Sequence, residues 1–448
     1  MKTIYFLNVL LYFFMNPIFA NNDTMLICGK AYDSEMKVNV YFDNKSYSSE
    51  VDNQEFSMKV PTNKGYGYIR YKETYKVYFS GKSGYNFQFN ETNGKEELVI
   101  KSEQDEINKY LMDKNKRLKE NELEIRYFNL PIYKLNYIEF THFVDSVFSF
   151  QNSILTNEKF QDDYFNYIEN LELASMKASF ILKYLLINEV NNLPDNEVFK
   201  KITLNDTIGY YGSDEYIQFV NLYIDKVSQD SIKNNGLLLS DYVFVKYKMI
   251  NQLISDNTIK YDMLSGLLKK AICDFGITKE VTLIYNDYLN NRAPVYKNDD
   301  IENLYIRMNA LSKGEMPSLV AYDVDTNEVF LENLTGENIF LLIYSFRCKE
   351  CLDEIQFIKK NESLFTDKNV TLVTIAIDGT YDEWISFLKR ENLEKGIHLH
   401  AFQNRREILE KLLVMKLPVG IVIDSNFKIK QIRVQKLTDI NLNEILTF

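Results

Sequence analysis

An apolar run that ends just before two closely spaced cysteines constrains this 448-residue chain more than any other feature. Residues 339–345 are predicted to form a buried strand, and a stretch with helical spacing begins near Cys348. Cys351 follows about one helical turn later, so its sulfur atom can reach that of Cys348. A C-x-x-C pair at a strand-to-helix junction predicts reversible thiol-disulfide chemistry.

The two thiols are expected to play different parts. Cys348 would lie at a helix N-terminus, where unpaired N–H groups and the helix dipole favour negative charge. Arg347 and Lys349 add positive charge nearby, and Glu350 partly opposes them. Cys351 would lie deeper. We therefore predict that Cys348 attacks a disulfide as its thiolate and that Cys351 resolves the resulting mixed disulfide.

Strand-like and helical runs alternate over the last part of the chain. This alternation predicts a largely parallel sheet with helices on both faces and a hairpin at its end. The predicted strands are Leu319–Tyr322, Val329–Leu331, Ile339–Ser345, Val370–Ile377, Ile397–Ala401, Val419–Ile423 and Ile429–Val434. The predicted helices begin near Cys348, Tyr381, Asn404 and Asp439.

Pro418 stands directly before one of these strands. A proline at the start of a strand has no N–H to donate to the ladder. A cis Leu417–Pro418 bond would expose the Leu417 backbone for pairing with an extended substrate. The sequence alone favours the trans isomer, because only about 5–6% of X-Pro bonds in folded proteins are cis.

Two further regions precede this one. Residues 21–103 contain short alternating runs separated by turn residues, which predicts a small antiparallel β-sandwich domain. These runs are Met25–Cys28, Val38–Phe42, Phe56–Val60, Tyr66–Tyr71, Lys76–Phe79, Tyr85–Phe89 and Leu98–Ile100. Residues 104–307 have helical periodicity and predict a helical domain, and residues 311–448 would form the α/β domain.

Residues 1–20 are predicted to be a secretory signal peptide. Lys2 provides a positive charge, Ile4–Met15 is apolar, Asn16-Pro17 interrupts the run, and Ala20 offers a cleavage site. No later stretch is long and apolar enough to span a bilayer. We expect a protein of the periplasm or cell envelope of a Gram-negative bacterium, without an integral membrane segment after cleavage.

The net charge and the cysteine content restrict the classes of partner and site that the sequence allows. The net charge of −11 without a basic stripe argues against nucleic acid as a partner. Of the four cysteines, Cys28 and Cys273 fall in apolar stretches and are expected to be buried free thiols, although a bridge between them stays open. Structural zinc would need two more ligands at short spacing from Cys348 and Cys351, and none follow.

Residues 311–448 resemble the TlpA/ResA-like periplasmic thiol-disulfide oxidoreductases of the thioredoxin superfamily. The resemblance rests on Gly314-Glu315-Met316-Pro317, Leu331-Glu332-Asn333-Leu334-Thr335-Gly336, Cys348-x-x-Cys351 with Glu354, Asp378 with Trp384, and Leu417-Pro418 leading into Ile423-Asp424. It implies a thioredoxin-like fold and a cis Leu417–Pro418 bond that holds the substrate backbone. The β region resembles the small sandwich that often precedes such modules in bacterial envelope proteins.

Several positions depart from the family pattern. Arg347 stands where the family has Trp, Lys349-Glu350 replaces the usual middle dipeptide, Gln356 replaces a helix proline, Val419 replaces Thr, and Leu342 stands where thioredoxins carry a buried Asp. Without that acid, Glu354 and Glu350 are the nearest candidates to manage the proton of Cys351. The alternative for both is an ordinary solvated helix residue.

The resulting hypothesis is a protein-disulfide oxidoreductase that acts more as a reductase or isomerase than as an oxidase. Its substrates would be disulfides of periplasmic proteins, and a membrane-bound electron donor would recycle it. No cofactor is needed, because the dithiol is the redox centre. The alternative is a redox-inactive thioredoxin-like binding or scaffold protein. His398 and His400 would share one face of a strand, but without a third ligand they suit a surface pair.

Overall fold

The computed structural model describes residues 24–33, 36–43, 45–81, 84–92, 94–101, 105–121, 130–156, 158, 160–194, 197–237, 241–334, 338–393, 395–434, 437 and 442–446. The predicted signal peptide, Thr335-Gly336 and the predicted helix start near Asp439 lie outside these residues. Contacts divide the chain into two compact units, Met1–Val227 and Ser228–Phe448, and the division falls within helix α6 (Asp214–Asn235). The three-domain partition stays a prediction.

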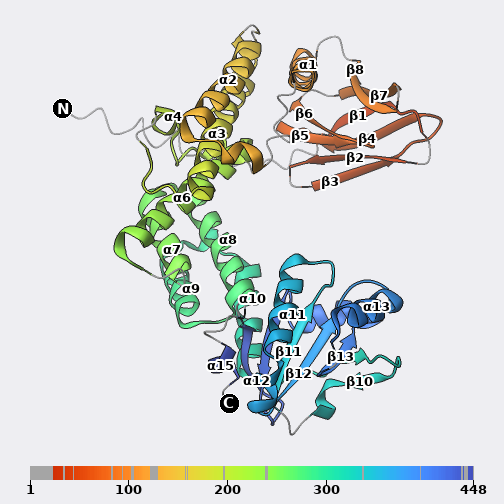
Figure 1. Cartoon of the computed structure of the whole chain (residues 1–448). Coiled ribbons are helices and arrows are strands. Elements are labelled where there is room, and N and C mark those ends of the chain that lie inside the picture. Colours follow the sequence, from red (N-terminus) through yellow and green to blue (C-terminus); the bar gives the residue numbers. More distant parts are fainter. Residues whose placement is uncertain are drawn as a thin grey trace. The chain divides into compact units, whose positions relative to one another are not determined.

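The N-terminal β region is a sandwich of two four-stranded sheets, with the orders β4-β1-β7-β8 and β3-β2-β5-β6 (Figure 1). The strands are β1 (Thr24–Lys30), β2 (Lys37–Phe42), β3 (Lys45–Glu50), β4 (Glu55–Pro61), β5 (Lys64–Arg70), β6 (Thr74–Ser80), β7 (Gly84–Thr92) and β8 (Lys95–Ile100). Alternate side chains meet in one apolar core, because successive residues of a strand face opposite sides. The pair β1–β7 is parallel, an exception to the predicted antiparallel pairing. The sequence pattern missed β3 because this edge strand is mostly polar.

A helical region follows, as predicted. Its helices are α1 (Glu106–Glu120), α2 (Tyr137–Thr156), α3 (Asp163–Ile187), α4 (Glu197–Lys200), α5 (Thr207–Gly212), α6, α7 (Tyr242–Leu253), α8 (Asn257–Phe275), α9 (Lys279–Asn291) and α10 (Asp299–Lys313). Many begin at an acidic or hydroxyl side chain that accepts one of the first free N–H groups; Asp162, for example, accepts from the Phe165 N–H. Within the described ranges, no helix is both long and apolar enough to cross a membrane.

The C-terminal α/β region contains one seven-stranded sheet with the order β10-β9-β13-β12-β11-β14-β15. Its strands are β9 (Val320–Tyr322), β10 (Glu328–Phe330), β11 (Asn338–Tyr344), β12 (Val370–Ala376), β13 (Ile397–His400), β14 (Val419–Ile423) and β15 (Ile429–Val434). Its helices are α11 (Lys349–Lys360), α12 (Glu362–Asp367), α13 (Tyr381–Glu391), α14 (Arg405–Lys411) and α15 (Leu442–Ile445).

The prediction of a largely parallel sheet was wrong. Among the described strands of this sheet only β11, β12 and β13 are parallel neighbours, and the pairs β9–β10, β9–β13, β11–β14 and β14–β15 are antiparallel. Short turns reverse the chain between β9 and β10 and between β14 and β15. The connection from β13 to β14 contains α14 but leads into an antiparallel strand, so a helix between two strands did not guarantee a parallel pair. The predicted closing hairpin is β14–β15.

Helices cover both faces of this sheet, as predicted, and β11 contributes to both cores. One core, here called the aliphatic face, contains Ile339, Leu341 and Ile343 with Ala271 and Ile272 of α8, Met308 of α10 and Ile408 of α14. The other, the thiol face, contains Phe340, Leu342 and Tyr344 with Cys351 and Ile355 of α11, Phe365 of α12 and Trp384 of α13. Helices α8 and α10, from the predicted helical domain, therefore form part of the core of the α/β region.

Candidate active site

The strand-to-helix junction places Cys348 where the sequence predicted it. Strand β11 ends at Tyr344, and Cys348 is the N-cap residue of α11. Its Sγ accepts a hydrogen bond from the Cys351 N–H at 3.3 Å, and its own N–H donates to the Ser345 carbonyl at 3.2 Å. Cys348 is half-buried, so the sulfur atom lies at a helix N-terminus and remains reachable.

Cys351 occupies a very different environment. Its side chain is 0% exposed and belongs to the thiol face. Burial, and then the hydrogen bond with Cys348, raise the pKa of the Cys351 thiol to about 12. The pair is therefore asymmetric: one thiol is accessible at the helix N-terminus, and the other is buried and protonated at neutral pH.

The two candidate acids also differ. Glu350 is exposed, and its Oε2 accepts from the Cys348 thiol at 3.5 Å. Hydrogen bonds from its own N–H and from that thiol, with smaller contributions from Lys416 and Lys349, lower the pKa of Glu350. Glu354 is only 5% exposed, and its Oε1 accepts from the Leu437 N–H at 2.9 Å. The alternative of a solvated helix residue is therefore wrong for Glu354, which shares the inward side of α11 with Cys351.

The loop between β11 and α11 is bound to the turn after β12. Asp378 accepts from the Ser345 hydroxyl at 2.7 Å and from the Phe346 N–H at 3.3 Å. The Ser345 Oγ in turn accepts from the Arg347 N–H at 3.1 Å. The sequence reasoning noted Asp378 only as part of a family pattern and did not identify Ser345. A polar residue directly after a buried parallel strand, next to the strand that leads to the cysteines, was the available signal.

Arg347 is directed to a different partner from the one expected. Its guanidinium contacts both carboxylate oxygens of Glu383, at 3.0 and 3.1 Å. The Glu383 carboxylate also caps the first turn of α13, where it accepts from the Thr380 N–H at 2.8 Å. Much of the positive charge of Arg347 is therefore compensated by Glu383 and is not available to Cys348 alone.

The Leu417–Pro418 bond is cis, the isomer that the resemblance implies. Leu417 and Cys348 are both partly buried and pack against the thiol face. Lys416 contributes to the electrostatic environment of Glu350, as described above. The segment before β14 thus lies at the same end of the sheet as the two cysteines.

The histidine pair is more buried than predicted. His400 is 2% exposed, donates from Nε2 to the Asp378 carbonyl at 2.9 Å and accepts at Nδ1 from the Phe402 N–H at 3.0 Å. His398 is bonded to Thr374 and to the Lys395 carbonyl. The expectation of a surface pair was therefore wrong for His400, because α13 covers this side of β13. Among the described residues no group of three metal-ligating side chains occurs.

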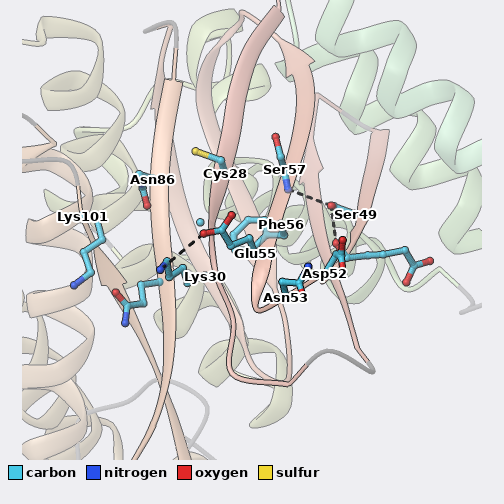
Figure 2. A pocket seen from close by; sticks show the side chains of 13 residues that line it. Cys28, Lys30, Ser49, Asp52, Asn53, Glu55, Phe56, Ser57, Asn86 and Lys101 are labelled. Carbon is cyan, nitrogen blue, oxygen red and sulfur yellow. Dashed lines mark hydrogen bonds and ion pairs between the residues drawn. The ribbon is translucent and has the colours of Figure 1, made fainter.

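The other two cysteines are free thiols and half-buried, so the expectation of full burial was wrong. Figure 2 shows Cys28 on the wall of an open pocket of the β sandwich, beside Ser57 and Asn86, its cross-strand neighbours on β4 and β7. No second cysteine is among the described residues that line this pocket. Burial raises the pKa of the Cys273 thiol in α8. Neither residue forms a second dithiol pair in the described structure.

Comparison with known proteins gives one family match: residues 336–429 match the model described as thioredoxin-like. The thiol-disulfide oxidoreductase ResA of Bacillus cereus is 24% identical over 115 residues, which are 26% of this chain and 65% of the relative. The ResA of Bacillus anthracis gives the same identity and coverage. The chain thus spans just under two thirds of the length of these curated relatives.

Solved structures with a similar C-terminal region include the thioredoxin domain of a thiol-disulfide oxidoreductase from Bacteroides vulgatus. It is 19% identical, covers 30% of this chain and 93% of its own, and has a TM-score of 0.27. A secreted disulfide oxidoreductase of Mycobacterium tuberculosis is 16% identical, covers 29% of this chain and 94% of its own, and has a TM-score of 0.26.

The family match and the geometry of the junction agree. The matched segment begins at the entrance to β11, contains the cysteine pair on α11 and extends through β14 to the start of β15. The resemblance of the N-terminal β sandwich to domains that precede such modules stays a prediction. The C-terminal part of this chain contains a thioredoxin-like domain that is related to the ResA-type thiol-disulfide oxidoreductases.

Proposed function

We propose that this protein is a thiol-disulfide oxidoreductase that reduces or isomerises disulfides of periplasmic proteins. The observation that carries the proposal is the asymmetric pair: Cys348 is accessible at the N-terminus of α11, and Cys351 is buried one turn later. An accessible attacking thiol and a protected resolving thiol are the two parts that disulfide exchange requires. The periplasmic location rests on the predicted signal peptide.

In the first step the Cys348 thiolate attacks one sulfur of a substrate disulfide. The S–S bond of the substrate breaks, a mixed disulfide forms at Cys348, and the second substrate sulfur leaves as a thiolate that takes up a proton. The Cys351 N–H and the N-terminus of α11 stabilise the attacking thiolate. Glu350, which accepts the Cys348 S–H, is the group to which that proton first passes.

In the second step Cys351 attacks the sulfur of Cys348. A Cys348–Cys351 disulfide forms, and the substrate leaves as its second thiolate, so the protein loses two electrons and two protons overall. Because the pKa of Cys351 is raised, this thiol must lose its proton at the moment of attack. We assign proton acceptance to Glu354, the buried acid one turn further along α11.

The surroundings of Cys348 favour the reducing direction. A dithiol becomes a strong oxidant when its reduced, thiolate form is stabilised. Here the Glu350 carboxylate lies 3.5 Å from the Cys348 sulfur, and Arg347 is paired with Glu383. The Glu350 carboxylate opposes a negative charge on the Cys348 sulfur, and the ion pair with Glu383 reduces the attraction that Arg347 would add. This arrangement supports closing of the disulfide and passage of electrons to the substrate. A membrane-bound electron donor would then restore the dithiol.

Substrate binding is assigned to the segment before β14. By the resemblance to the family, the Leu417 backbone pairs with an extended substrate chain, and Pro418 shapes the segment. The exposed Met415 lies two residues before Leu417 and offers an apolar contact for the substrate. The competing function, a redox-inactive binding or scaffold protein, would use the same surface without exchange at Cys348.

Reduction of insulin disulfides in the presence of dithiothreitol separates the two functions. We expect the protein without its first twenty residues to accelerate precipitation of the insulin B chain, and Cys348→Ala and Cys348→Ser to abolish the acceleration. Cys273→Ser serves as the matched control and should keep full activity. Equal, near-zero activity of all four proteins would refute the oxidoreductase function and support the redox-inactive scaffold protein. A Cys351→Ala variant should retain its substrate as a mixed disulfide, which mass spectrometry can identify.

A further inference from the structure

The loop that leads to Cys348 is held mainly by one neighbouring segment. Residues 345–347 contact the turn after β12 and the first two turns of α13. Ser345 and the Phe346 N–H bind the Asp378 carboxylate, and Arg347 binds Glu383. The Phe346 ring stacks on Phe387, with centroids 5.5 Å apart. The hydrogen bonds among these contacts join residues that are 32 to 36 positions apart in the sequence.

We propose that Ser345 and Asp378 are positioning residues for the dithiol: their hydrogen bond fixes the loop so that Cys348 stays aligned with the N-terminus of α11. The inference rests on the proposed function for its biochemical meaning. It concerns two side chains that act through the backbone of the loop, and the backbone of Ser345 is itself hydrogen-bonded to the Cys351 thiol.

Ser345 forms hydrogen bonds through both its hydroxyl and its carbonyl group. Its hydroxyl donates to Asp378 at 2.7 Å and accepts from the Arg347 N–H at 3.1 Å. Its carbonyl accepts from the Cys348 N–H at 3.2 Å. One side chain anchored on a charged acceptor therefore fixes the backbone on both sides of Phe346 and, through it, Cys348. Without the hydroxyl, the 3.3 Å contact between the Cys348 Sγ and the Cys351 N–H loses its support.

Asp378 is itself fixed from behind. Its carbonyl accepts from the buried His400, whose other ring nitrogen accepts from the Phe402 N–H. The next residue, Gly379, has φ of 77°, and a Cβ atom there would lie 2.1 Å from the Phe346 Cζ. The turn after β12 thus needs glycine both for its backbone conformation and for the close approach of the loop. A bonded series runs from β13 through Asp378 to the loop.

The ion pair between Arg347 and Glu383 contributes less to this arrangement. Their side chains are 61% and 48% exposed, and exposed ion pairs contribute little because water and salt screen them. The hydrogen bonds to Asp378 lie on the part-buried side of the loop, where water competes less. The test therefore concentrates on Ser345 and Asp378 and uses Glu383 for comparison.

The test measures the rate at which iodoacetamide alkylates Cys348 in the full chain between pH 5 and 9. We expect Ser345→Ala to slow alkylation at pH 7 by roughly tenfold, since it removes a hydrogen bond to a charged group, and to move the midpoint of the profile to higher pH. Ser345→Thr keeps the hydroxyl and should restore the wild-type profile. Glu383→Gln should change the rate less than twofold or so.

Asp378→Asn keeps the size of the side chain and is the second variant of the test. Loss of the Asp378 charge favours the Cys348 thiolate, whereas the weaker hydrogen bonds of asparagine loosen the loop. The effect of Asp378→Asn is therefore measured in a double-mutant cycle with Ser345→Ala. We expect non-additive effects, because both variants break the same hydrogen bond. The exposed Asp382→Asn is the matched control and should leave the profile unchanged.

Three results would overturn the inference: a wild-type alkylation profile for Ser345→Ala, no rescue by Ser345→Thr, or additive effects in the cycle. Equilibration with glutathione provides a second readout, in which Ser345→Ala should shift the dithiol toward the disulfide by the same factor. Alkylation requires no substrate. A protein that fails to reduce insulin but shows these shifts would refute the proposed function and leave the positioning of Cys348 intact.

Discussion

The two faces of β11 pack against cores of different residue composition. The aliphatic face is made almost entirely of Ala, Val, Ile, Leu and Met side chains, with Phe427 as the exception among its buried members. The thiol face contains Cys351, Tyr344 and Trp384, and the polar residues Glu354, Thr374 and His400 are buried on the same side of the sheet. Neighbouring residues of one strand thus serve two different cores. One is mostly aliphatic, and against it the buried Arg433 guanidinium donates to the Cys273, Leu412 and Leu413 carbonyls; the other contains several buried polar groups.

The difference in composition shows that buried polar side chains are concentrated on the thiol face. A buried polar group costs free energy unless it is hydrogen-bonded. On the thiol face, Glu354 accepts from Leu437, and His400 is bonded at both ring nitrogens. Both groups lie on the side of the sheet that contains Cys351. The aliphatic face has no cysteine or acidic side chain among its described buried members, and α8 and α10 complete it.

The strongest test of the difference between the two faces places an aspartate at each of two neighbouring positions of β11. We expect Leu341→Asp to prevent folding, because an unpaired carboxylate in the aliphatic face costs several kcal/mol of a total stability of about 5–15 kcal/mol. Leu342→Asp should fold, since this side chain points to the thiol face, where thioredoxins carry an acid. Circular dichroism during urea unfolding measures both. Equal destabilisation by the two variants would show that the faces do not differ.

The contrast between the thiols themselves is the second test. At pH 8, iodoacetamide should modify Cys348 at least about 100-fold faster than Cys351. The thiolate is the reactive form, and the pKa of Cys351 is raised to about 12, so this residue stays protonated well above pH 8. Peptide mass spectrometry after timed quenching resolves the two sites. Comparable rates at both cysteines would contradict the asymmetry of the pair.

The third test concerns the helices that complete the aliphatic face. Met308 of α10 is 0% exposed in that core, and Met308→Ala should lower the free energy of unfolding by about 2–5 kcal/mol. Met415→Ala, at a methionine that is 62% exposed, is the matched control and should change stability by less than about 0.5 kcal/mol. Chemical denaturation of both variants gives the values. A neutral Met308→Ala would mean that α10 is dispensable for the core.

The smallest expected effect is a pH dependence of the thiol face. Burial lowers the pKa values of His398 and His400. In the folded state these rings therefore bind protons less readily than in the unfolded chain, whose histidines titrate near 6.5. Their contribution to stability is present above about pH 6.5 and is lost as the pH falls toward the lowered folded-state values.

Unfolding measured between pH 5 and 8 would show this decline, and the double variant His398→Gln/His400→Gln should flatten it. The exposed His142→Gln is the control and should leave the slope unchanged. A pH dependence that is the same in all three proteins would assign the slope to other groups.

Local patterns explain why much of the fold was predictable. Apolar runs of strand length located β11, β12 and β14, and the strand-to-helix junction placed Cys348 at the start of α11. These features depend on residues close together in the sequence, where propensity and hydrophobic period act directly. The order and direction of the strands depend on pairings between distant segments, so the parallel pair β1–β7 and the mixed C-terminal sheet were not predicted.

By itself, the sequence determined that an accessible thiol and a second thiol one turn later open a helix after a buried strand. Only the tertiary structure decided which groups surround them. Glu354 is buried because Leu437, 83 residues away, lies against it, and Ser345 is anchored because Asp378 follows the neighbouring strand. A carboxylate has the same local pattern whether it is solvated or buried. Its chemistry is fixed by partners that only the folded chain brings into contact.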